Sequence, residues 1–297
     1  MGAYLGLALG DALGATVEFM TPREIVFAHG VHRDIVGGGW LKLQAGAVTD
    51  DTTMALALGD AMVENGGWSM DAVAASFVRW FRSRPVDCGN TCRRGISRFL
   101  ANGTLSGPPS DADGGNGALM RNLPVVLGHL GDPDAMARRT IEQCHFTHHH
   151  WLSDAAAVAF AGLVRALILG MPPERWREPI DALVESDPVF RFAPYPGRAG
   201  GYVVDTVQTV LHHFFLHADF EDCVVATVNR GDDADTNGAL AGMLAGARCG
   251  CRSLPRRWMR ALDRGVARRI REQTRALLTL AAGVGSRGIL PETVGKA

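Results

Sequence analysis

Small residues dominate the first eighteen positions of the chain, where the residue pattern is otherwise that of an apolar helix. Glycine and alanine occupy eight of these positions: Gly2, Ala3, Gly6, Ala8, Gly10, Ala12, Gly14 and Ala15. Each glycine costs a helix roughly 0.5–1 kcal/mol relative to alanine. Because that cost is tolerable where a neighbouring backbone must come close, we predict that residues 1–18 form a core helix and not a signal peptide, which would begin with basic residues.

A packet of oxygen-bearing side chains stands at the head of the next helical pattern. Thr49, a good N-cap residue, is followed by Asp50, Asp51 and an apolar stripe of helical spacing within 54–62. The free N–H groups and the dipole of a first helical turn favour negative charge there. Helix capping alone would explain this packet.

A second packet of the same form lies far downstream. Gly231 ends the preceding segment, Asp233, Asp235 and Thr236 follow, and a small-residue run over 238–247 comes after them. With Asp232, three carboxylates crowd into four residues, and they repel one another unless a cation or solvent relieves them. Hard divalent cations prefer such oxygen ligands. If the two helix starts meet, the packets predict a site for one or two metal ions.

The composition permits a sizeable core and excludes several classes of function. The chain has 297 residues, of which 47% are hydrophobic and 21% charged, and we expect a single domain over 1–297. A net charge of −1 gives no reason to expect nucleic acid as a partner. No apolar run reaches the roughly 18–20 residues of a transmembrane segment. Six irregularly spaced cysteines favour a reducing cytoplasm over secretion.

Helical spacing recurs along the chain, whereas convincing alternating strand patterns do not. Beyond the segments above, it covers 68–101 with a break at Pro85, the stretch that Tyr202 opens, and a basic amphipathic helix over 255–282. Glycine-rich or proline-rich stretches at 29–48, 103–117 and 193–201 predict loops. We therefore predict an all-α, single-domain helical bundle.

Individual polar residues outside the packets are weaker candidates for a site. Asp87 lies in a turn between two helical patterns, where Thr91 can cap the second helix, and an Asx-type turn is the simpler explanation of Asp87. Glu18 ends the first helix, where it either meets solvent or faces a site. Tyr202 follows a glycine-rich loop, so it either stacks on a base or sugar or packs on its own helix.

Two further segments have residues typical of binding sites, but local structure could explain the same residues. Asn116 and Gly117 stand where a helix is expected to start, and free N–H groups there suit a phosphate, although the pair alone is only a turn. Arg121, further along, is expected as a surface charge. The cluster 145–150 holds four histidines, which could indicate a zinc site. Adjacent histidines point in different directions, however, so at most one or two of them could bind the same ion. We favour a helix cap and one histidine that faces a site.

In combination, these segments resemble the motifs of ADP-ribosylglycohydrolases. The motifs stand in that family's order at 10–18, 48–52, 87–91, 116–121, 147–148 and 231–236. The resemblance extends over nearly the whole chain and is greatest to the branch that acts on the iron protein of nitrogenase. It implies an all-α fold and an enzyme that removes ADP-ribose from a modified arginine of a protein.

The resemblance also implies roles for individual residues. The metal ligands would be Thr49, Asp50, Asp51, Asp233, Asp235 and Thr236, holding two divalent ions, with Mn²⁺ foremost and Mg²⁺ or Fe²⁺ as alternatives. Asp87 and Glu18 match catalytic positions, and the ADP-ribose cleft would be lined by Asn90, Asn116, Gly117 and His148, with Tyr202 on the adenine. One departure is Asp232, where the family usually has glycine.

The implied substrate is ADP-ribosylated dinitrogenase reductase, with a nitrogen-status signalling protein as regulator. The implied location is the cytoplasm, with membrane association through that partner. One alternative is hydrolysis of another linkage, serine-linked or O-acetyl-ADP-ribose, at the same metal site. Another is a non-catalytic ADP-ribose-binding protein, which should have lost ligands that this chain retains. Two-metal phosphohydrolysis would usually need histidine ligands, which neither packet supplies.

Overall fold

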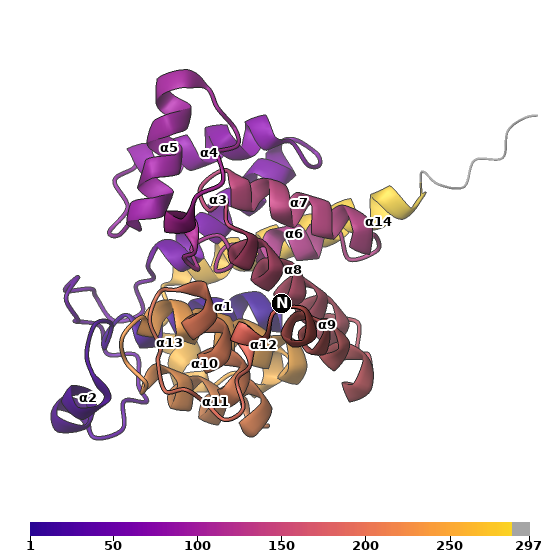
Figure 1. Cartoon of the computed structure of the whole chain (residues 1–297). Helices are drawn as coiled ribbons and strands as arrows, with labels where there is room; N and C mark the ends of the chain where they lie inside the picture. The colour runs from indigo at the N-terminus through magenta and orange to yellow at the C-terminus, as the bar shows by residue number, and fades with distance from the viewer. Residues whose placement is uncertain (287–297) are drawn as a thin grey trace, which may run out of the picture.

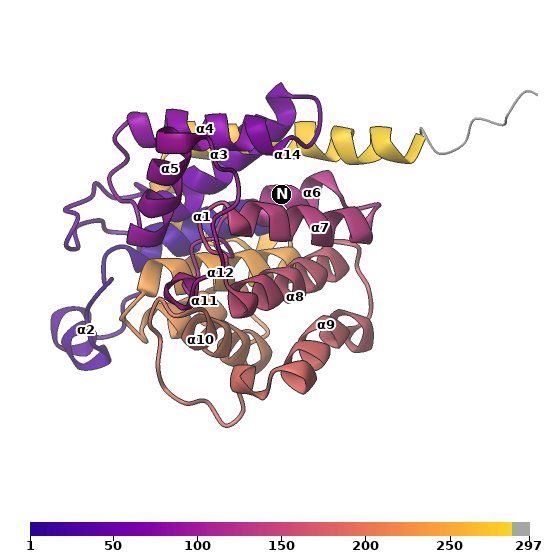
Figure 2. The ribbon, with the colours of Figure 1, turned by 45° about the horizontal axis from the view of Figure 1, so that its top comes forward.

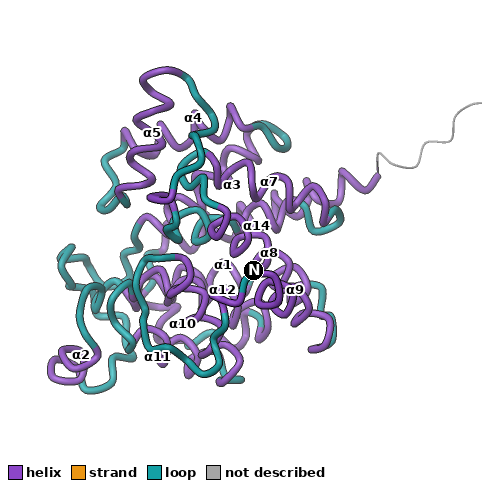
Figure 3. Tube along the Cα trace, viewed as in Figure 1, coloured by secondary structure: helices purple, strands orange, loops and turns teal. Residues whose placement is uncertain are grey.

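The computed structural model describes residues 1–286, and within that range the regular structure is helical (Figure 3). The α-helices are α1 (Gly2–Gly14), α2 (Pro22–His29), α3 (Asp50–Glu64), α4 (Met70–Arg82), α5 (Asn90–Asn102), α6 (Leu123–Gly128), α7 (Pro133–His145), α8 (Trp151–Ile168), α9 (Pro173–Ser186), α10 (Val203–Leu216), α11 (Phe220–Val228), α12 (Ala234–Cys249), α13 (Arg256–Ala261) and α14 (Arg264–Ser286). Two isolated β-bridges, Gly38–Leu43 and Gly115–Tyr202, are the only strand-like pairings in the described range. The predicted all-α class is confirmed.

Helices α1 and α12 lie side by side through the centre of the fold (Figures 1 and 2). Every residue of α1 is buried. A Cβ atom placed on Gly10 would lie 1.9 Å from the carbonyl oxygen of Gly238, and one on Gly6 would lie 2.1 Å from that of Gly242. No side chain fits at such distances, so the close backbone approach predicted for residues 1–18 is confirmed, and the partner is the downstream small-residue run.

Helix α3 is fixed at the junction of two apolar cores. It contributes Ala55 and Leu56 to the larger core, which surrounds α1 and α12. From its other side, Met54 and Leu58 pack into a smaller core shared with α4 and α5. Because apolar burial holds α3 on both sides, its N-terminal end has a fixed place beside the start of α12.

The first helix is shorter than the sequence predicts. It ends at Gly14 and not at residue 18, and the chain then turns through Phe19, whose φ is 63°. Gly14 packs against the backbone of Ala234, where an added Cβ would lie 2.2 Å from a carbonyl oxygen. The N–H of Phe19 donates to the carbonyl of Asp232 at 2.7 Å. These contacts redirect the chain and carry Glu18 across the start of α12.

The basic segment predicted as one helix over 255–282 forms two helices, α13 and α14. Leu262 has extended backbone angles and is buried, which interrupts the helical path. Asp263 then accepts a hydrogen bond from the N–H of Val266 at 2.8 Å and caps α14. The break follows from the burial of one leucine, which helical periodicity alone does not reveal.

Helix α8 is the one helix of residues 1–286 that is long and apolar enough to cross a membrane, with a mean hydropathy of 1.5 over 18 residues. Within the fold, 61% of that window is buried. Its Asp154 pairs with His145 at 2.8 Å, and its Arg165 donates to the carbonyl of Leu130. Burial against α7, α9 and α12 explains its apolar composition as that of a core helix.

Candidate functional site

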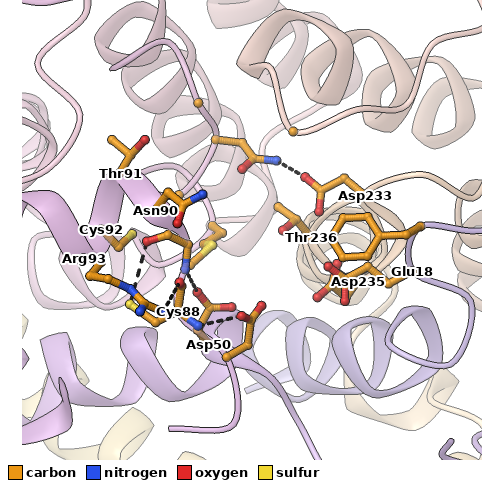
Figure 4. A pocket seen from close by; sticks show the side chains of 18 of the residues that line it. Glu18, Asp50, Cys88, Asn90, Thr91, Cys92, Arg93, Asp233, Asp235 and Thr236 are labelled. Carbon is orange, nitrogen blue, oxygen red and sulfur yellow. Dashed lines mark hydrogen bonds between the residues drawn. The ribbon is translucent and has the colours of Figure 1, made fainter. Parts of the chain in front are cut away.

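A cleft of about 570 Å³ opens where the N-terminal ends of α3, α5 and α12 approach one another. Figure 4 shows residues of α5 on one side, Glu18 and residues of α12 on the other, and Asp50 between them. The predicted site residues that line this cleft are Glu18, Asp50, Asp87, Asn90, Asn116, Gly117, His148, Asp233, Asp235 and Thr236. Segments separated by more than two hundred residues in sequence therefore form one surface.

Direct contacts join the two oxygen packets. The hydroxyl of Thr236 donates to Oδ2 of Asp51 at 3.3 Å, which links the starts of α12 and α3. Thr49 donates to the same oxygen at 3.1 Å. Thr49 and Asp51 are buried behind the residues that line the cleft. The meeting of the helix starts, on which the predicted metal site depended, is therefore present.

The start of α3 is capped by Asp11 of α1 and not by the side chain of Thr49, which makes no capping hydrogen bond. The backbone N–H groups of Thr49 and Thr52 donate to the Asp11 carboxylate at 2.9 and 3.1 Å, and the Thr52 hydroxyl donates at 2.5 Å. Burial raises the pKa of Asp11 to about 6. This role of Asp11 was not predicted, although Asp11 is the only charged side chain among the first seventeen residues.

Several carboxylates at the base of the cleft have no ion-pair partner in the described part of the chain. Oxygen atoms of Glu18, Asp233 and Asp235 all lie within 4.8 Å of one another. Oδ1 of Asp51 and Oδ1 of Asp235 are buried and have no hydrogen-bond partner among the described residues. Such atoms are costly to bury unless a ligand binds them. The residues therefore fit a divalent cation, since every donor is a hard oxygen.

The electrostatics of these groups agree with that assignment. Burial, together with the charge of Asp233, raises the pKa of Glu18 to about 8. Burial, followed by the charge of Asp87, raises the pKa of Asp50 to about 7. For Asp51 and Asp235, burial and neighbouring carboxylates raise the pKa well above the ordinary value. A bound cation would reverse these shifts by stabilising the ionised forms.

Asp87 forms a hydrogen bond within its own turn and also lines the cleft. Its Oδ1 accepts a hydrogen bond from the N–H of Cys88, the next residue, at 2.7 Å. An Asx turn would use the N–H two residues on, that of Gly89, so the predicted Asx-type turn is not formed. The next N–H, that of Gly89, donates to Asp50 at 3.2 Å. Helix α5 begins at Asn90 with Gly89 as its N-cap, so the predicted cap at Thr91 is wrong. The bond from Gly89 to Asp50 therefore ties the start of α5 to the start of α3.

Asn116 connects the opposite wall of the cleft to α10 and α12. Its side-chain amide donates to Thr206 at 2.8 Å and to Asp233 at 2.6 Å. The segment from Asn116 to Arg121 is a turn, and α6 begins only at Leu123, so the predicted helix start at 116 is wrong. The N–H of Asn116 is bonded to the carbonyl of Gly201 at 3.1 Å, so it is not free to bind a phosphate.

One histidine of the 145–150 cluster lines the cleft, as predicted. It is His148, whose Cε1 would lie 2.9 Å from a Cβ placed on Gly117. His150 caps α8 by accepting the N–H of Leu152 at 3.1 Å. His145 pairs with Asp154 and stacks on the ring of His149. The predicted combination of a helix cap and one site-facing histidine is confirmed.

Tyr202 and Trp40 are aromatic residues at or beside the cleft. Tyr202 is 46% exposed at the start of α10 and packs on Gly114, beside the lining residue Gly201. Trp40, to which the sequence analysis gave no role, lines the cleft, and its Nε1–H donates to Glu18 at 2.6 Å. The sequence signal for Trp40 was a tryptophan within a glycine-rich loop.

Arg121 is not at the surface, and Asp232 has an unusual backbone conformation. Arg121 is completely buried and lies over the ring of Phe77 at 4.7 Å, so the predicted surface charge is wrong. Asp232 lines the cleft with a φ of 56°, a region that favours glycine, and its N–H donates to the carbonyl of Met20. This backbone geometry suits the glycine that the family resemblance led us to expect at this position.

Known proteins similar to this chain match it over nearly its whole length. A model of the ADP-ribosylglycohydrolase family matches residues 1–287. The ADP-ribosyl-[dinitrogen reductase] glycohydrolase of Rhodospirillum rubrum is 50% identical over 281 residues, which cover 95% of this chain and 96% of that protein. The ADP-ribosylarginine hydrolase Tri1 of Pseudomonas putida (strain GB-1) is 32% identical over 276 residues, covering 87% of this chain and 72% of that protein.

A solved structure gives the same result for the fold. A chain described as "ADP-ribosylglycohydrolase-related protein complex" superposes with a TM-score of 0.83 and 33% sequence identity. The superposition covers 94% of this chain and 96% of the other. Since sequence, fold and family model agree from end to end, this chain belongs to the ADP-ribosylglycohydrolase family.

Proposed function

We propose that the chain removes ADP-ribose from a modified arginine of dinitrogenase reductase and thereby reactivates that protein. The observation that carries the proposal is the 50% identity, over 95% of the chain, to a glycohydrolase named for that substrate. The acidic cleft supports it, because the described lining residues include six carboxylates and one arginine, Arg93. Such a cleft suits a reaction that develops positive charge on a sugar. We also propose that 1–297 act as one domain, since the family match covers 1–287.

Two divalent ions, Mn²⁺ foremost, would be held at the base of the cleft. The proposed ligands are Thr49, Asp50, Asp51, Asp233, Asp235 and Thr236. Glu18 lies in the same carboxylate group as Asp233 and Asp235, so its charge also acts there. When bound, such ions supply positive charge that orients ribose hydroxyls and lowers the pKa of water. The raised pKa values of these buried carboxylates support a site built for cations.

The remaining residues act on the bond and on the rest of ADP-ribose. Breaking the N-glycosidic bond to a guanidinium group passes through an oxocarbenium-like state. The Asp87 carboxylate would face that charge or move a proton at the reacting centre. Asn90, Asn116, Gly117 and His148 would position the sugar and diphosphate, since their backbone and side-chain groups line the same cleft. Asn116 also holds Asp233 in place through its amide.

The linkage specificity is tested by presenting the purified enzyme with Mn²⁺ and three substrates. We expect ADP-ribose to be released faster from ADP-ribosylarginine protein than from serine-linked ADP-ribose or O-acetyl-ADP-ribose. Free ADP-ribose is measured by chromatography, with an Asp235→Ala preparation as the control for contaminating hydrolases. Faster cleavage of the serine linkage would contradict the assignment. Binding of ADP-ribose without release from any substrate would instead favour a non-catalytic binding protein.

Tyr202 is proposed as a partial cover for the adenine at the rim of the cleft. Its ring is half-exposed and borders Gly201, a lining residue. Stacking of a base on an aromatic ring contributes roughly 1–3 kcal/mol. We therefore expect Tyr202→Ala to weaken ADP-ribose binding by about tenfold or more, while Tyr202→Phe retains the affinity and both variants retain their metal. Calorimetric titration measures this, and unchanged affinity in Tyr202→Ala would leave the ring only its packing on Gly114.

Regulation and location are supported by the resemblance alone. Control by a nitrogen-status signalling protein, and membrane association through that partner from the cytoplasm, stay predictions. Most of the apolar helix α8 is buried within the fold. A co-sedimentation experiment with membranes, in the presence and absence of the signalling protein, would test the association directly.

A further inference from the structure

Arg121 carries a buried positive charge that has no carboxylate partner among the described residues. Its side chain has no solvent exposure. Its guanidinium donates to the side-chain and backbone oxygens of Gln143 at 2.8 and 2.9 Å, to the hydroxyl of Thr147 at 2.8 Å and to the sulfur of Cys92 at 3.5 Å. All four acceptors are neutral. Burying a charge on neutral partners is costly, so this arrangement calls for a reason beyond packing.

Thr147 connects Arg121 to His148, which lines the cleft. Thr147 is buried, and its hydroxyl oxygen makes two contacts, with Arg121 and with Nδ1 of His148 at 2.7 Å. A guanidinium group can only donate, so the threonine oxygen accepts from Arg121. The threonine proton then has one acceptor within reach among the described residues, which is Nδ1 of His148. Because a buried hydroxyl proton is left without a partner only at a cost, Nδ1 must be the unprotonated nitrogen.

This direction of donation determines the state of His148. The hydrogen bond at one ring nitrogen decides which nitrogen carries the proton, so the proton resides on Nε2. Burial, and next the charge of Arg121, hold the pKa of His148 well below its ordinary value, so the ring stays neutral. Nε2 would lie 3.3 Å from a Cβ on Gly115 and 3.1 Å from one on Gly117, both of which line the cleft.

We propose that Arg121 is a positioning residue that acts through Thr147 to hold His148 as the Nε2–H tautomer, a fixed hydrogen-bond donor at the cleft wall. A neutral donor beside small glycines suits an anionic oxygen such as one of a diphosphate. That identification of the ligand rests on the proposed function, whereas the relay itself rests on the contacts of the three side chains. Neither Arg121 nor Thr147 touches the ligand in this arrangement.

The relay is tested on the free protein by ¹⁵N NMR of the histidine rings at neutral pH, with the His148 signal identified by its loss in His148→Gln. We expect the parent to show Nε2–H and unprotonated Nδ1. Thr147→Val keeps the side-chain shape but removes the hydroxyl, and Arg121→Met removes the donor to it. In both variants the Nδ1–H form should become detectable, and Thr147→Ser should restore the parent spectrum.

A matched control comes from Thr140, which is buried in α7 and accepts a hydrogen bond from Asn122 without touching His148. Thr140→Val should leave the His148 spectrum unchanged. If Arg121→Met does not fold, Thr147→Val decides the question alone. Protonation of Nδ1 in the parent, or an unchanged His148 spectrum in a folded Thr147→Val variant, would overturn the relay, whatever substrate the enzyme cleaves.

Binding and kinetics provide a second readout. With ADP-ribose as the probe, Thr147→Val should raise the dissociation constant about tenfold, the ordinary effect of weakening one hydrogen bond to a charged acceptor. With substrate, KM should rise similarly while kcat stays within about threefold, since the contact is the same before and during reaction. A fall in kcat at constant KM would contradict the positioning role. If no ADP-ribosyl substrate is cleaved, the proposed function fails, and the NMR result still decides the relay.

Discussion

Removal of divalent metal from the purified protein is expected to abolish ADP-ribose release, and Mn²⁺ is expected to restore it. The physical reason is the group of buried carboxylates at the base of the cleft, where the oxygens of Glu18, Asp233 and Asp235 lie within 4.8 Å of one another. Without a cation, burial and mutual repulsion raise the pKa of these groups and favour their protonated forms. Activity before and after exhaustive dialysis against EDTA measures the effect.

The same prediction extends to single residues. Asp235→Ala removes a ligand whose Oδ1 is buried with no hydrogen-bond partner in the described structure, so we expect lost metal as well as lost activity. Metal content is measured by atomic emission on the dialysed protein. Asp232→Gly is the control, because glycine suits the φ of 56° at this neighbouring position and should leave the metal bound. Full activity in excess EDTA would contradict the proposed metal dependence.

Asp87→Asn is expected to lower turnover at least a hundredfold. The substitution keeps an oxygen that can accept from the N–H of Cys88, so the turn before α5 is preserved. It removes the negative charge and the basicity from the cleft. General acid–base catalysis typically raises the rate of a reaction by a factor of about 10²–10⁴. Because Asp87 belongs to neither oxygen packet, metal content and ADP-ribose affinity should survive, and single-turnover kinetics with ADP-ribosylarginine protein measures the loss.

The control for Asp87 is another carboxylate of the same cleft. Asp232→Asn removes an equal charge from a lining residue in an exposed turn whose φ asparagine tolerates. Its turnover should stay within a few-fold of the parent. An equal loss in both variants would indicate a general charge effect. Turnover of Asp87→Asn within about threefold of the parent would remove Asp87 from the mechanism and make Glu18 the better candidate.

The sequence predicted the helical class and the two oxygen packets at helix starts because these features depend on local patterns. Apolar residues at helical spacing identified the helix that begins at Asp50, and glycines at close intervals identified a helix that must touch another backbone. The two oxygen packets were also recognisable, because Thr49 and Asp233 stand at helix starts where their neighbours can serve as ligands. These features need only the identity and spacing of adjacent residues.

Contacts between distant segments decided the rest. The partner of α1 is α12, more than two hundred residues away, and the bond from Thr236 to Asp51 spans 185 residues. The cap of α3 comes from Asp11, and the burial of Arg121 depends on acceptors from α7 and the turn that follows it. Local spacing carries no information about which elements meet. Only the folded core, by placing α1, α3 and α12 together, gives each carboxylate its neighbours, its burial and therefore its chemistry.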